Sequence, residues 1–349
     1  MGTKMRTAVM KGIGSMEFVE RDIPEPAEGE VLVRIEYVGI CGSDLHYYEF
    51  GAIGNFVVNP PFVLGHESAG TVVKTGGGVT RLKAGDRVTL EPGKTCGHCE
   101  FCRTGRYNLC PDVIFFATPP VDGVFQEYAV HPESLCFKLP DNMDSMEGAL
   151  IEPLSVGFHA ASLGEGRPGQ TAVVMGAGCI GLVSMLALGA RGVGRVFVVD
   201  VAAKRLEHAL RLGATAVIDA AHQDVASEIA RLTEGAGSDI VIETAGAEAT
   251  TRQAIAVAKK GSVIVLVGYS KSGEMTLPLS DALNKELTFK CVFRYRHVYP
   301  AAIDAVALGG LRLKDIVTDI FEFDDIQNAM DRSVADKQNI VKAVIKIAG

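Results

Sequence analysis

Two different patterns of apolar and polar positions divide the chain. From the first residue to about Leu150, short stretches alternate apolar and polar residues and are separated by glycine-rich turns, which is typical of half-buried strands. The segment EVLVRIEYV, for example, places Val31, Val33, Ile35 and Tyr37 on one face. We expect this part to be all-β and irregular, and we expect its first strand within MGTKMRTAVMKGIGSMEF.

From about Pro153 to Phe293, short apolar runs alternate with helical patterns. AVVMGAG is followed by CIGLVSMLALGA, RVFVVD by AAKRLEHALRLG, AVID by DVASEIARLTEG, and DIVIETAG by EATTRQAIAVAKK and then SVIVLVG. Such an alternation is typical of β-α-β units and predicts an α/β fold, a mostly parallel sheet with helices on both faces. The tail, 294–349, mixes helical patterns with a final strand in IVKAVIKI. We expect it to pack back onto one of the other two parts.

The composition excludes several classes of protein. Of the 349 residues, 48% are apolar and 22% are charged, so the chain has enough apolar surface to fold and is not a disordered chain. The net charge of -8 argues against a nucleic-acid partner, because binding to phosphates depends on clustered Lys and Arg. The one short basic and aromatic patch, residues 293–297, is interpreted as a domain edge with solvated arginine heads.

The chain does not open with an apolar segment of signal-peptide length, and we expect a cytoplasmic protein. One stretch, Thr171–Ala190, has twenty residues without a charge and is long enough to span a membrane. Its glycine pattern and the acid that follows at Asp200 favour a different interpretation, so we expect no membrane partner.

That interpretation is a dinucleotide-binding turn. Gly176, Gly178 and Gly181 form a G-x-G-x-x-G motif between an expected strand and an expected helix, and Asp200 ends the next strand nineteen residues later. The first glycine permits a tight turn, the second lets the backbone approach a pyrophosphate, and the third lets helix and strand pack closely. Asp200 should bind the adenosine ribose hydroxyls and repel a 2′-phosphate, which predicts NAD rather than NADP. Arg205 is either a solvated helix residue or a contact near the adenine.

Four cysteines lie close together in TCGHCEFCRTGRYNLC, at positions 96, 99, 102 and 110. In a protein expected to be cytoplasmic, disulfides are disfavoured, and four thiolates at this spacing complete the tetrahedral shell of a structural zinc ion. One alternative is four free thiols. An iron–sulfur cluster is a lesser alternative, because the usual cysteine spacings of such clusters differ from this one. His98 lies within the loop but is surplus to a four-sulfur shell.

A second, looser set combines Cys41, His66 and Glu67 with the distant Glu152. Thiolate, imidazole and carboxylate ligands suit an open zinc site in which one position stays exchangeable. Their spacing does not establish such a site, because ligands 25 or more residues apart have no fixed geometry. Cys41 could instead be a small buried apolar residue and His66 a hydrogen-bonded core histidine.

Together these motifs resemble those of the zinc-dependent medium-chain dehydrogenases, and within them the polyol dehydrogenases of the sorbitol and xylitol group. The resemblance runs along essentially the whole chain, in CGSDLHYYEFG, PFVLGHESAGTV, AGDRV, the four-cysteine loop, FFATPPVDGVFQEY, EPLSVG, GAGCIG, VVD-x4-RL and VFRY. It implies a GroES-like β-rich catalytic domain in residues 1–153 and a Rossmann NAD-binding domain in 154–293. The segment 294–349 is then expected to return to the catalytic domain.

By the same resemblance, Cys41, His66 and Glu67 hold a catalytic zinc ion, and water or the substrate alcohol completes its shell. Glu152 stands where related alcohol dehydrogenases have a second cysteine. It is expected beside the metal-bound water and the substrate, with direct ligation as the alternative. Asp44 matches the carboxylate that orients the ligand histidine, a role with its own physical basis.

The remaining matched positions fall into three groups. The residues implied in catalysis and proton transfer are Ser43, His46 and Glu152. The residues implied in substrate binding are Tyr47, Phe116, Glu152, Arg294 and Tyr295. The residues implied in NAD contacts are Gly176, Gly178, Ile180, Gly181, Asp200, Arg205, Val267, Gly268, Tyr269, Val292, Phe293 and Arg294.

The expected activity is the reversible, NAD-dependent and zinc-assisted oxidation of a polyol of the sorbitol or xylitol type at a secondary hydroxyl, which gives a ketose. Animal sorbitol dehydrogenases lack the four-cysteine zinc, so the chain looks more like a bacterial or fungal polyol dehydrogenase, and the preferred polyol stays open. The alternatives are another secondary alcohol, of the threonine or 2,3-butanediol type, and a non-catalytic NAD-binding protein. Members of the group are usually homotetramers, with dimers also found.

Overall fold

The computed structural model of the protein describes residues 4–270 and 273–348, and the chain divides into two compact units. The first unit is made of Met1–Glu152, Tyr299–Ala307 and Val317–Gly349, and the second of Pro153–Val298 and Leu308–Ile316. The tail therefore contributes residues to both units. The division falls within one helix, α3 (Ser145–Leu163).

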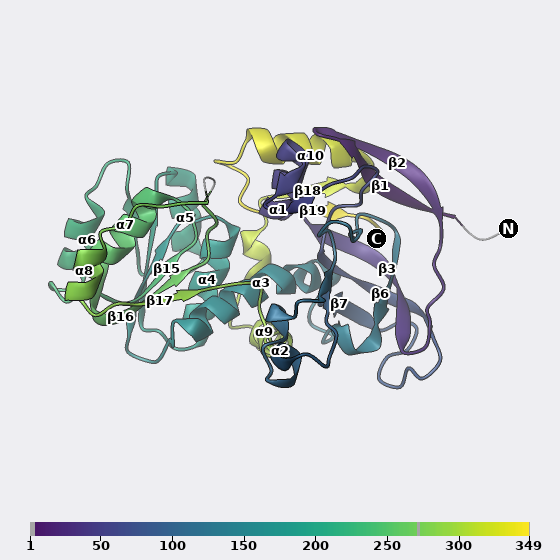
Figure 1. The fold of residues 1–349 in the computed structure, drawn as a ribbon, viewed down its shortest axis with the longest axis horizontal. Helices are drawn as coiled ribbons and strands as arrows, with labels where there is room; N and C mark the ends of the chain where they lie inside the picture. Colours follow the sequence, from purple (N-terminus) through teal and green to yellow (C-terminus); the bar gives the residue numbers. More distant parts are fainter. Residues whose placement is uncertain (1–3, 271–272, 349) are drawn as a thin grey trace. The chain divides into compact units, whose positions relative to one another are not determined.

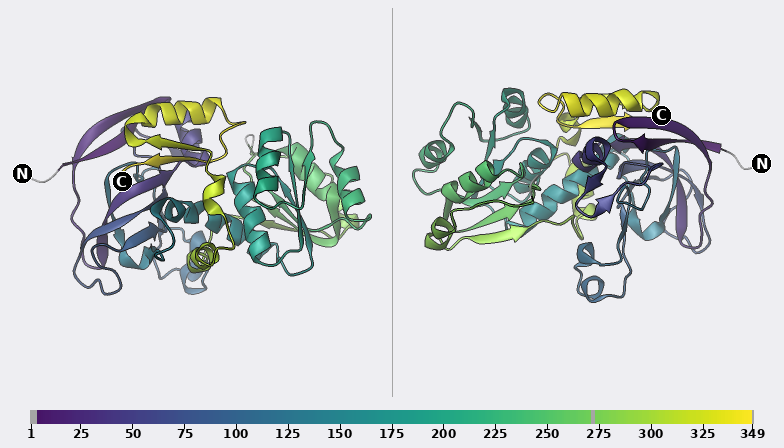
Figure 2. Two further views of the ribbon diagram at one scale, coloured as in Figure 1. Left: turned by 180° about the vertical axis from the view of Figure 1, so that it is seen from behind. Right: turned by 45° about the horizontal axis from the view of Figure 1, so that its top comes forward.

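The first unit is organised around a seven-stranded sheet. Its strands are β3 (Glu30–Gly39), β6 (Glu67–Thr75), β7 (Arg87–Leu90), β10 (Tyr128–Pro132), β11 (Cys136–Lys138), β18 (Asp319–Glu322) and β19 (Ala343–Lys346). Their order is β11-β7-β6-β3-β19-β18, and β10 also pairs with β3. The expected final strand is thus β19, which runs antiparallel to β3 and pairs Val344 with Gly39. Figure 2 shows the last strands and α10 in yellow beside the purple strands from the start of the chain.

Shorter elements surround this sheet. They are the hairpin β1 (Lys4–Gly12) and β2 (Ser15–Asp22), the pairs β4 (Ala52–Ile53) with β5 (Phe56–Val57) and β8 (Gly93–Lys94) with β9 (Ile114–Phe115), the helices α1 (Gly42–Phe50), α2 (Glu100–Arg103), α9 (Tyr299–Ala307) and α10 (Ile326–Ala335), and the 3-10 turns η1 (Tyr107–Leu109), η2 (Glu133–Leu135) and η4 (Phe323–Asp325). Buried apolar side chains from the sheet, the hairpin, α1 and α10 form one core, with Ile35, Leu64 and Phe125 fully enclosed.

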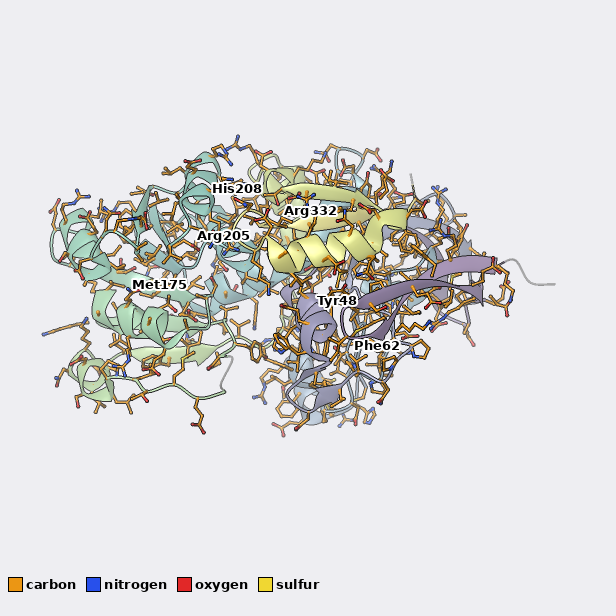
Figure 3. The ribbon with its side chains drawn as sticks, turned by 90° about the horizontal axis from the view of Figure 1, so that it is seen from above. Tyr48, Phe62, Met175, Arg205, His208 and Arg332 are labelled. Atoms are coloured by element: carbon orange, nitrogen blue, oxygen red, sulfur yellow. The ribbon has the colours of Figure 1, made fainter. Side chains whose placement is uncertain are left out.

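The expectation that the first 150 residues are all-β is wrong at α1, and again at the short helix α2. Helix α1 begins after Cys41 because the carboxylate of Asp44, at the third helical position, accepts the Cys41 N–H. Such a reciprocal cap satisfies backbone donors that the first turn leaves free. Gly51 ends the helix in the left-handed conformation, with φ of 73°. Tyr48, labelled in Figure 3, fixes α1 to α10 by donating a hydrogen bond of 2.6 Å to Asp331.

The second unit contains the predicted parallel sheet, with six strands in the order β14-β13-β12-β15-β16-β17. The strands are β12 (Thr171–Met175), β13 (Arg195–Asp200), β14 (Ala216–Asp219), β15 (Ser238–Glu243), β16 (Ala258–Leu266) and β17 (Thr288–Cys291). The helices are α4 (Cys179–Ala190), α5 (Ala203–Arg211), α6 (Val225–Leu232), α7 (Glu248–Val257) and α8 (Leu279–Asn284), with the 3-10 turn η3 (Leu313–Ile316). The order runs outward in both directions from β12 and β15, so right-handed crossovers place helices on opposite faces. In Figure 1, α6, α7 and α8 gather on one side of the sheet, away from α4.

The uncharged stretch Thr171–Ala190 is interrupted by the glycine turn and forms β12 and α4 rather than one long helix. No helix among residues 4–270 and 273–348 is both long enough and apolar enough to cross a membrane. The point at which strand order reverses, between β12 and β15, is where ligands bind in open parallel sheets. The glycine turn follows β12 directly and therefore lies at this point.

Candidate metal centres and dinucleotide site

The first candidate metal centre brings together Cys41, His66 and Glu67, whose ligand atoms all lie within 4.8 Å of one another. Cys41 precedes α1, His66 precedes β6, and Glu67 is the first residue of β6. Both His66 and Glu67 are buried, and Cys41 is partly exposed. A thiol, an imidazole and a carboxylate at this spacing are the donor set of an open zinc site.

Asp44 ties together the segments that carry these ligands. Its side chain is completely buried, and its two carboxylate oxygens accept hydrogen bonds from the backbone N–H of Cys41 at 3.0 Å and from that of Gly65 at 2.9 Å. Gly65 has φ of 88°, and a Cβ there would lie 2.9 Å from the ring of Phe125. The carboxylate of Asp44 therefore fixes both Cys41 and the turn that leads into His66.

The electrostatics of this centre favour a cation. Burial by itself would lower the pKa of His66, but the charges of Asp44 and Cys41 outweigh it and raise that pKa well above its ordinary value. Within the described residues, the buried Nδ1 of His66 has no hydrogen-bond partner, and Oδ1 of Asp44 lies 3.7 Å from it. The negatively charged setting fits a bound zinc ion, and Asp44 lies on the Nδ1 side of the ring, where it can orient the imidazole.

Two further residues shape this centre, and sequence reasoning missed both. Lys342, 2% exposed, forms an ion pair with Oε2 of Glu67 and donates a hydrogen bond of 3.0 Å to the carbonyl oxygen of Ile40. Gly39 lies on the strand between them, and a Cβ there would overlap Oε2 of Glu67 and lie 3.0 Å from Cε of Lys342. The only sequence signal was a lysine inside the apolar run IVKAVIKI.

The second candidate metal centre is the four-cysteine loop, where the thiols of residues 96, 99, 102 and 110 also lie within 4.8 Å of one another. The amides of Cys99 and Cys102 each donate to the sulfur three residues earlier, at 3.4 Å. Hydrogen bonds from backbone N–H groups lower the pKa of the Cys96 thiol to about 6, and the largest contribution comes from the N–H of His98. His98 itself is not among the grouped side chains, and its ring contacts the carbonyl oxygen of Cys96. Among residues 4–270 and 273–348, the loop therefore presents four grouped sulfurs and no fifth ligand.

A buried polar chain connects this loop to the body of the unit. Tyr107 lies between the third and fourth cysteine and donates a hydrogen bond of 2.7 Å to the carboxylate of Glu91, whose pKa is raised by burial. The ring of His131 hydrogen-bonds the carbonyl oxygen of Glu91 at 2.8 Å, and burial lowers the pKa of His131 to about 4. Phe116, one of the expected substrate residues, packs on the His131 ring with centroids 4.8 Å apart.

Helix α1 carries three of the expected site residues, Ser43, His46 and Tyr47. Tyr47 is buried, and the ring of His46 packs on Phe50 with centroids 4.8 Å apart. Residues three and four apart share one face of a helix, so Ser43 projects from the same side as His46 and Tyr47. Glu152 is buried within α3, and the structure does not include it in the group formed by Cys41, His66 and Glu67.

The glycine turn of the second unit has the geometry that its motif predicts. Gly176 has φ of 101°, and a Cβ on it would lie 2.8 Å from Oγ1 of Thr244. A Cβ on Gly181 would overlap the carbonyl oxygen of Gly176, so only glycine allows the helix to approach the strand this closely. Gly178 caps α4, and nothing lies near its missing side chain except a guanidinium nitrogen of Arg205 at 3.9 Å. The N-terminus of α4, which includes Ile180, therefore lies directly after the turn, where the first N–H groups of a helix favour a phosphate.

Asp200 ends β13 beside this turn. Its Oδ2 accepts the N–H of Ala177 at 2.7 Å, and its Oδ1 accepts those of Val201 at 2.8 Å and Ala202 at 2.9 Å. Arg205 lies on α5, as Figure 3 shows, with a guanidinium nitrogen 4.0 Å from Oδ2. The Asp200 carboxylate therefore stabilises the glycine turn through the N–H of Ala177 and also lies at the edge of that turn.

The other expected cofactor residues follow the ends of two neighbouring strands. Val267 and Gly268 continue β16, and both backbone N–H groups donate to the carbonyl oxygen of Glu243. Gly268 packs so closely against Gly246 that a side chain would overlap its backbone, whereas the next residue, Tyr269, is 74% exposed.

Val292 continues β17 in the same way, by donating to the carbonyl oxygen of Leu266. The guanidinium of Arg294 lies over the ring of Phe293, and its backbone has φ of 54°. Tyr295 is buried. A left-handed backbone is uncommon for residues other than glycine and is enriched at functional sites.

Comparison with known proteins decides the family. Residues 27–141 match the family model described as the alcohol dehydrogenase GroES-like domain, and residues 179–307 match the zinc-binding dehydrogenase model. The uncharacterized zinc-type alcohol dehydrogenase-like protein YdjJ of Escherichia coli is 46% identical over 99% of both chains. The chain belongs to the zinc-binding alcohol dehydrogenases. Sorbitol dehydrogenase of Bacillus subtilis, another member, is 42% identical over 98% of this chain and 97% of its own.

Solved structures give the same family and fold. ECK1772, an Escherichia coli oxidoreductase of unknown specificity, matches with a TM-score of 0.95 and 45% identity over 99% of this chain and 100% of its own. An Escherichia coli alcohol dehydrogenase (rspB) in complex with NADH matches with a TM-score of 0.91 and 29% identity over 99% and 100%. The resemblance and the fold predicted from the sequence are confirmed, and the protein is an oxidoreductase of the zinc-type alcohol and polyol dehydrogenase class.

Proposed function

We propose that this dehydrogenase oxidises a polyol of the sorbitol or xylitol type at a secondary hydroxyl to the ketose, reversibly and with NAD⁺ as the hydride acceptor. The observation that carries the proposal is the close grouping of Cys41 with the buried His66 and Glu67. It offers three ligands of the kinds that leave a fourth zinc position open. The B. subtilis relative named sorbitol dehydrogenase supports the choice of substrate class.

We assign a different role to each candidate metal centre. The four cysteines at positions 96, 99, 102 and 110 would hold a structural zinc ion, because four sulfurs leave no position for a substrate. Cys41, His66 and Glu67 would hold the catalytic one. A zinc ion bound there supplies a Lewis acid that lowers the pKa of a coordinated alcohol. Glu152 is assigned to the substrate and the metal-bound water, with direct ligation as the alternative.

The reaction transfers a hydride from the carbinol carbon to NAD⁺ and releases the hydroxyl proton, so that a secondary alcohol becomes a ketone. We assign proton transfer to Ser43 and His46 on α1, with a route by water beside Glu152 as the alternative. The two routes make different predictions. Replacing His46 with alanine should shift the acidic limb of the pH–rate profile only if this histidine carries the proton.

Substrate choice is assigned to Tyr47, Phe116, Glu152, Arg294 and Tyr295. Glu152 and Arg294 would pair with neighbouring hydroxyl groups of a polyol. A simple alkanol would leave both groups without partners, at a cost of about 1–3 kcal/mol each. This difference favours polyols over ethanol.

The cofactor assignment rests on the glycine turn and on the carboxylate of Asp200 beside it. A carboxylate at this position repels a 2′-phosphate, so we expect NAD to be preferred over NADP. The NADH complex of the rspB structure supports a nicotinamide cofactor. NAD contacts are assigned to Gly176, Gly178, Ile180, Gly181, Asp200, Arg205, Val267, Gly268, Tyr269, Val292, Phe293 and Arg294. A cytoplasmic location and a homotetramer, with a dimer as the alternative, complete the proposal.

Steady-state rates on sorbitol, xylitol, ribitol, galactitol and L-iditol with NAD⁺, followed by NADH absorbance, test the proposal. We expect at least one pentitol or hexitol to be oxidised with a much higher kcat/KM than ethanol. Metal analysis should find two zinc ions per chain. Turnover of 2,3-butanediol or threonine without turnover of any pentitol or hexitol would refute the polyol assignment, and zinc-free wild-type turnover would refute the metal assignment.

A further inference from the structure

Lys342 is buried, and a charged side chain in such a position must be compensated by its surroundings. Only 2% of its side chain is exposed, and the same is true of its partner Glu67. Removing an ammonium group from water costs several kcal/mol unless a carboxylate and further hydrogen bonds compensate it. Lys342 obtains both, from Oε2 of Glu67 and from the carbonyl oxygen of Ile40 at 3.0 Å. It therefore contacts one expected zinc ligand and the residue that precedes another.

The sheet explains how this contact arises. Gly39 pairs with Glu67 on one neighbouring strand and with Val344 on the other, so Lys342, two residues before Val344, approaches from the opposite side. Strands that both flank a third are about 10 Å apart. Their side chains can meet over the middle strand only where that strand has no side chain. Gly39 supplies this gap, since a Cβ would overlap Oε2 of Glu67 and crowd Cε of Lys342.

Formal charges point the same way. Around the first metal centre, ionised Cys41, Asp44 and Glu67 would carry three negative charges among buried or partly buried groups. A divalent zinc ion would offset two of the charges on Cys41, Asp44 and Glu67, and the ammonium of Lys342, paired with Glu67, would offset the third.

We propose that Lys342 is a positioning residue of the catalytic zinc centre, which holds one carboxylate oxygen of Glu67 away from the metal so that Glu67 offers only its other oxygen. This role rests on the proposed function, because it assumes that Cys41, His66 and Glu67 bind zinc. Without the ammonium group, both oxygens of Glu67 become available to the ion, and the centre gains one negative charge. The metal is then held more tightly and with a higher coordination number.

The variant that tests this role is Lys342→Met, which keeps the length of the side chain and removes its charge. The measurement is the rate at which a chelator removes zinc from the first centre, with zinc in the four-cysteine loop as an internal control for folding. We expect at least tenfold slower removal from the first centre and an unchanged rate from the loop. In protein loaded with cobalt in place of zinc, the visible absorption should weaken and shift as the coordination number rises.

A matched control is Lys285→Met in the second unit. The ammonium of Lys285 also satisfies backbone carbonyl oxygens, those of residues 255, 256 and 258, but it contacts no metal centre. This variant should lose stability without changing zinc removal or the cobalt spectrum. A purely structural Lys342 would behave in the same way, or would release zinc faster, and either result would overturn the proposal.

Two further arms separate the remaining outcomes. If Lys342→Met does not fold, Lys342→Gln keeps a hydrogen-bond donor without the charge and takes its place in the same measurements. In a chain that carries Glu67→Gln, the Lys342 substitution should no longer slow zinc removal. Equal slowing there would mean that the ammonium acts on the metal directly, and the positioning role would be wrong. Wild-type protein that binds only the loop zinc would refute the proposed function instead.

Discussion

Replacing Gly39 with alanine should displace the Glu67 carboxylate while the rest of the sheet stays intact. The new Cβ would overlap Oε2 of Glu67 and would lie 3.1 Å from its Cδ and 3.0 Å from Cε of Lys342. Ordinary contacts between carbon atoms need about 3.5–4.0 Å. Both side chains must therefore move by roughly half an ångström or more. A zinc–ligand distance tolerates about 0.2 Å, so this displacement exceeds what the centre can absorb.

The expected loss of stability follows from two contributions. Forcing a methyl group into a filled space costs about 1–3 kcal/mol. If the alanine also separates Glu67 from Lys342, each buried charge loses its partner, and breaking a buried ion pair costs about 3–5 kcal/mol. We therefore expect the free energy of unfolding, measured by urea denaturation, to fall by about 1–3 kcal/mol if the ion pair survives and by about 4–8 kcal/mol if it breaks. Unlike Lys342→Met, which would leave the Glu67 carboxylate in place, the new methyl group moves that carboxylate itself, so the first metal centre should lose its zinc to a chelator at concentrations that leave the four-cysteine zinc in place.

Gly12→Ala is the matched control. Gly12 also lies in a strand, outside the left-handed region, and nothing lies within 4 Å of a Cβ built on it. This variant should differ from the wild type by less than about 1 kcal/mol and should keep two zinc ions per chain. If Gly39→Ala behaves like Gly12→Ala in both measurements, the close approach of Glu67 to β3 is not a constraint on the site.

Three other substitutions test separate parts of the first unit. Tyr107→Phe removes the hydrogen bond to the buried carboxylate of Glu91 and should cost about 1–3 kcal/mol in urea unfolding; the loss should largely vanish when Glu91 is already Leu, which has no acceptor, and full additivity would contradict the link. His131 has its pKa lowered to about 4 by burial, so between pH 6.5 and 4 the unfolded chain binds the extra proton and stability falls as pH falls, by up to about 1.4 kcal/mol per pH unit. His131→Gln should make this slope shallower while His222→Gln, at an exposed ring, should not, and equal slopes in both variants would refute the assignment. Cys102→Ser should reduce the zinc content from two ions to one and expose the loop to proteolysis, whereas a variant that keeps two ions would show that this cysteine is not a ligand.

The features that sequence reasoning predicted are those encoded by neighbouring residues. The glycine turn is read from six consecutive positions, and its geometry follows from the absence of Cβ atoms at Gly176 and Gly181. The four cysteines lie within fifteen residues, so the loop that joins them can bring their sulfurs together without help from the rest of the fold. The parallel sheet was predicted from the alternation of apolar runs and helical patterns, which repeats along most of the second unit.

Helix α1 shows where local patterns fail. The segment GSDLHYYEF has no apolar stripe of the kind that predicts a helix, and it follows a clear strand. The helix forms because its ends are capped, by Asp44 at the start and Gly51 at the end, and because Tyr48 bonds to Asp331. The hydrogen bond from Tyr48 to Asp331 joins residues 283 positions apart, so it cannot be inferred from the local sequence.

The first metal centre depends on sheet register in the same way, and this is why its ligands were recognised but its counter-charge was not. Cys41, His66 and Glu67 could be nominated by residue type and by resemblance, whereas Lys342 joins them only because β19 pairs with β3 beside β6. A signal was nevertheless present. A lysine that is buried in an apolar run costs free energy unless an acidic group compensates its charge. The run IVKAVIKI contains two lysines, Lys342 and Lys346, of which only Lys342 is buried. Neither the buried lysine nor its acidic partner can be chosen from the run itself, because both depend on which strands flank β3, so the fold was needed to connect Lys342 to Glu67.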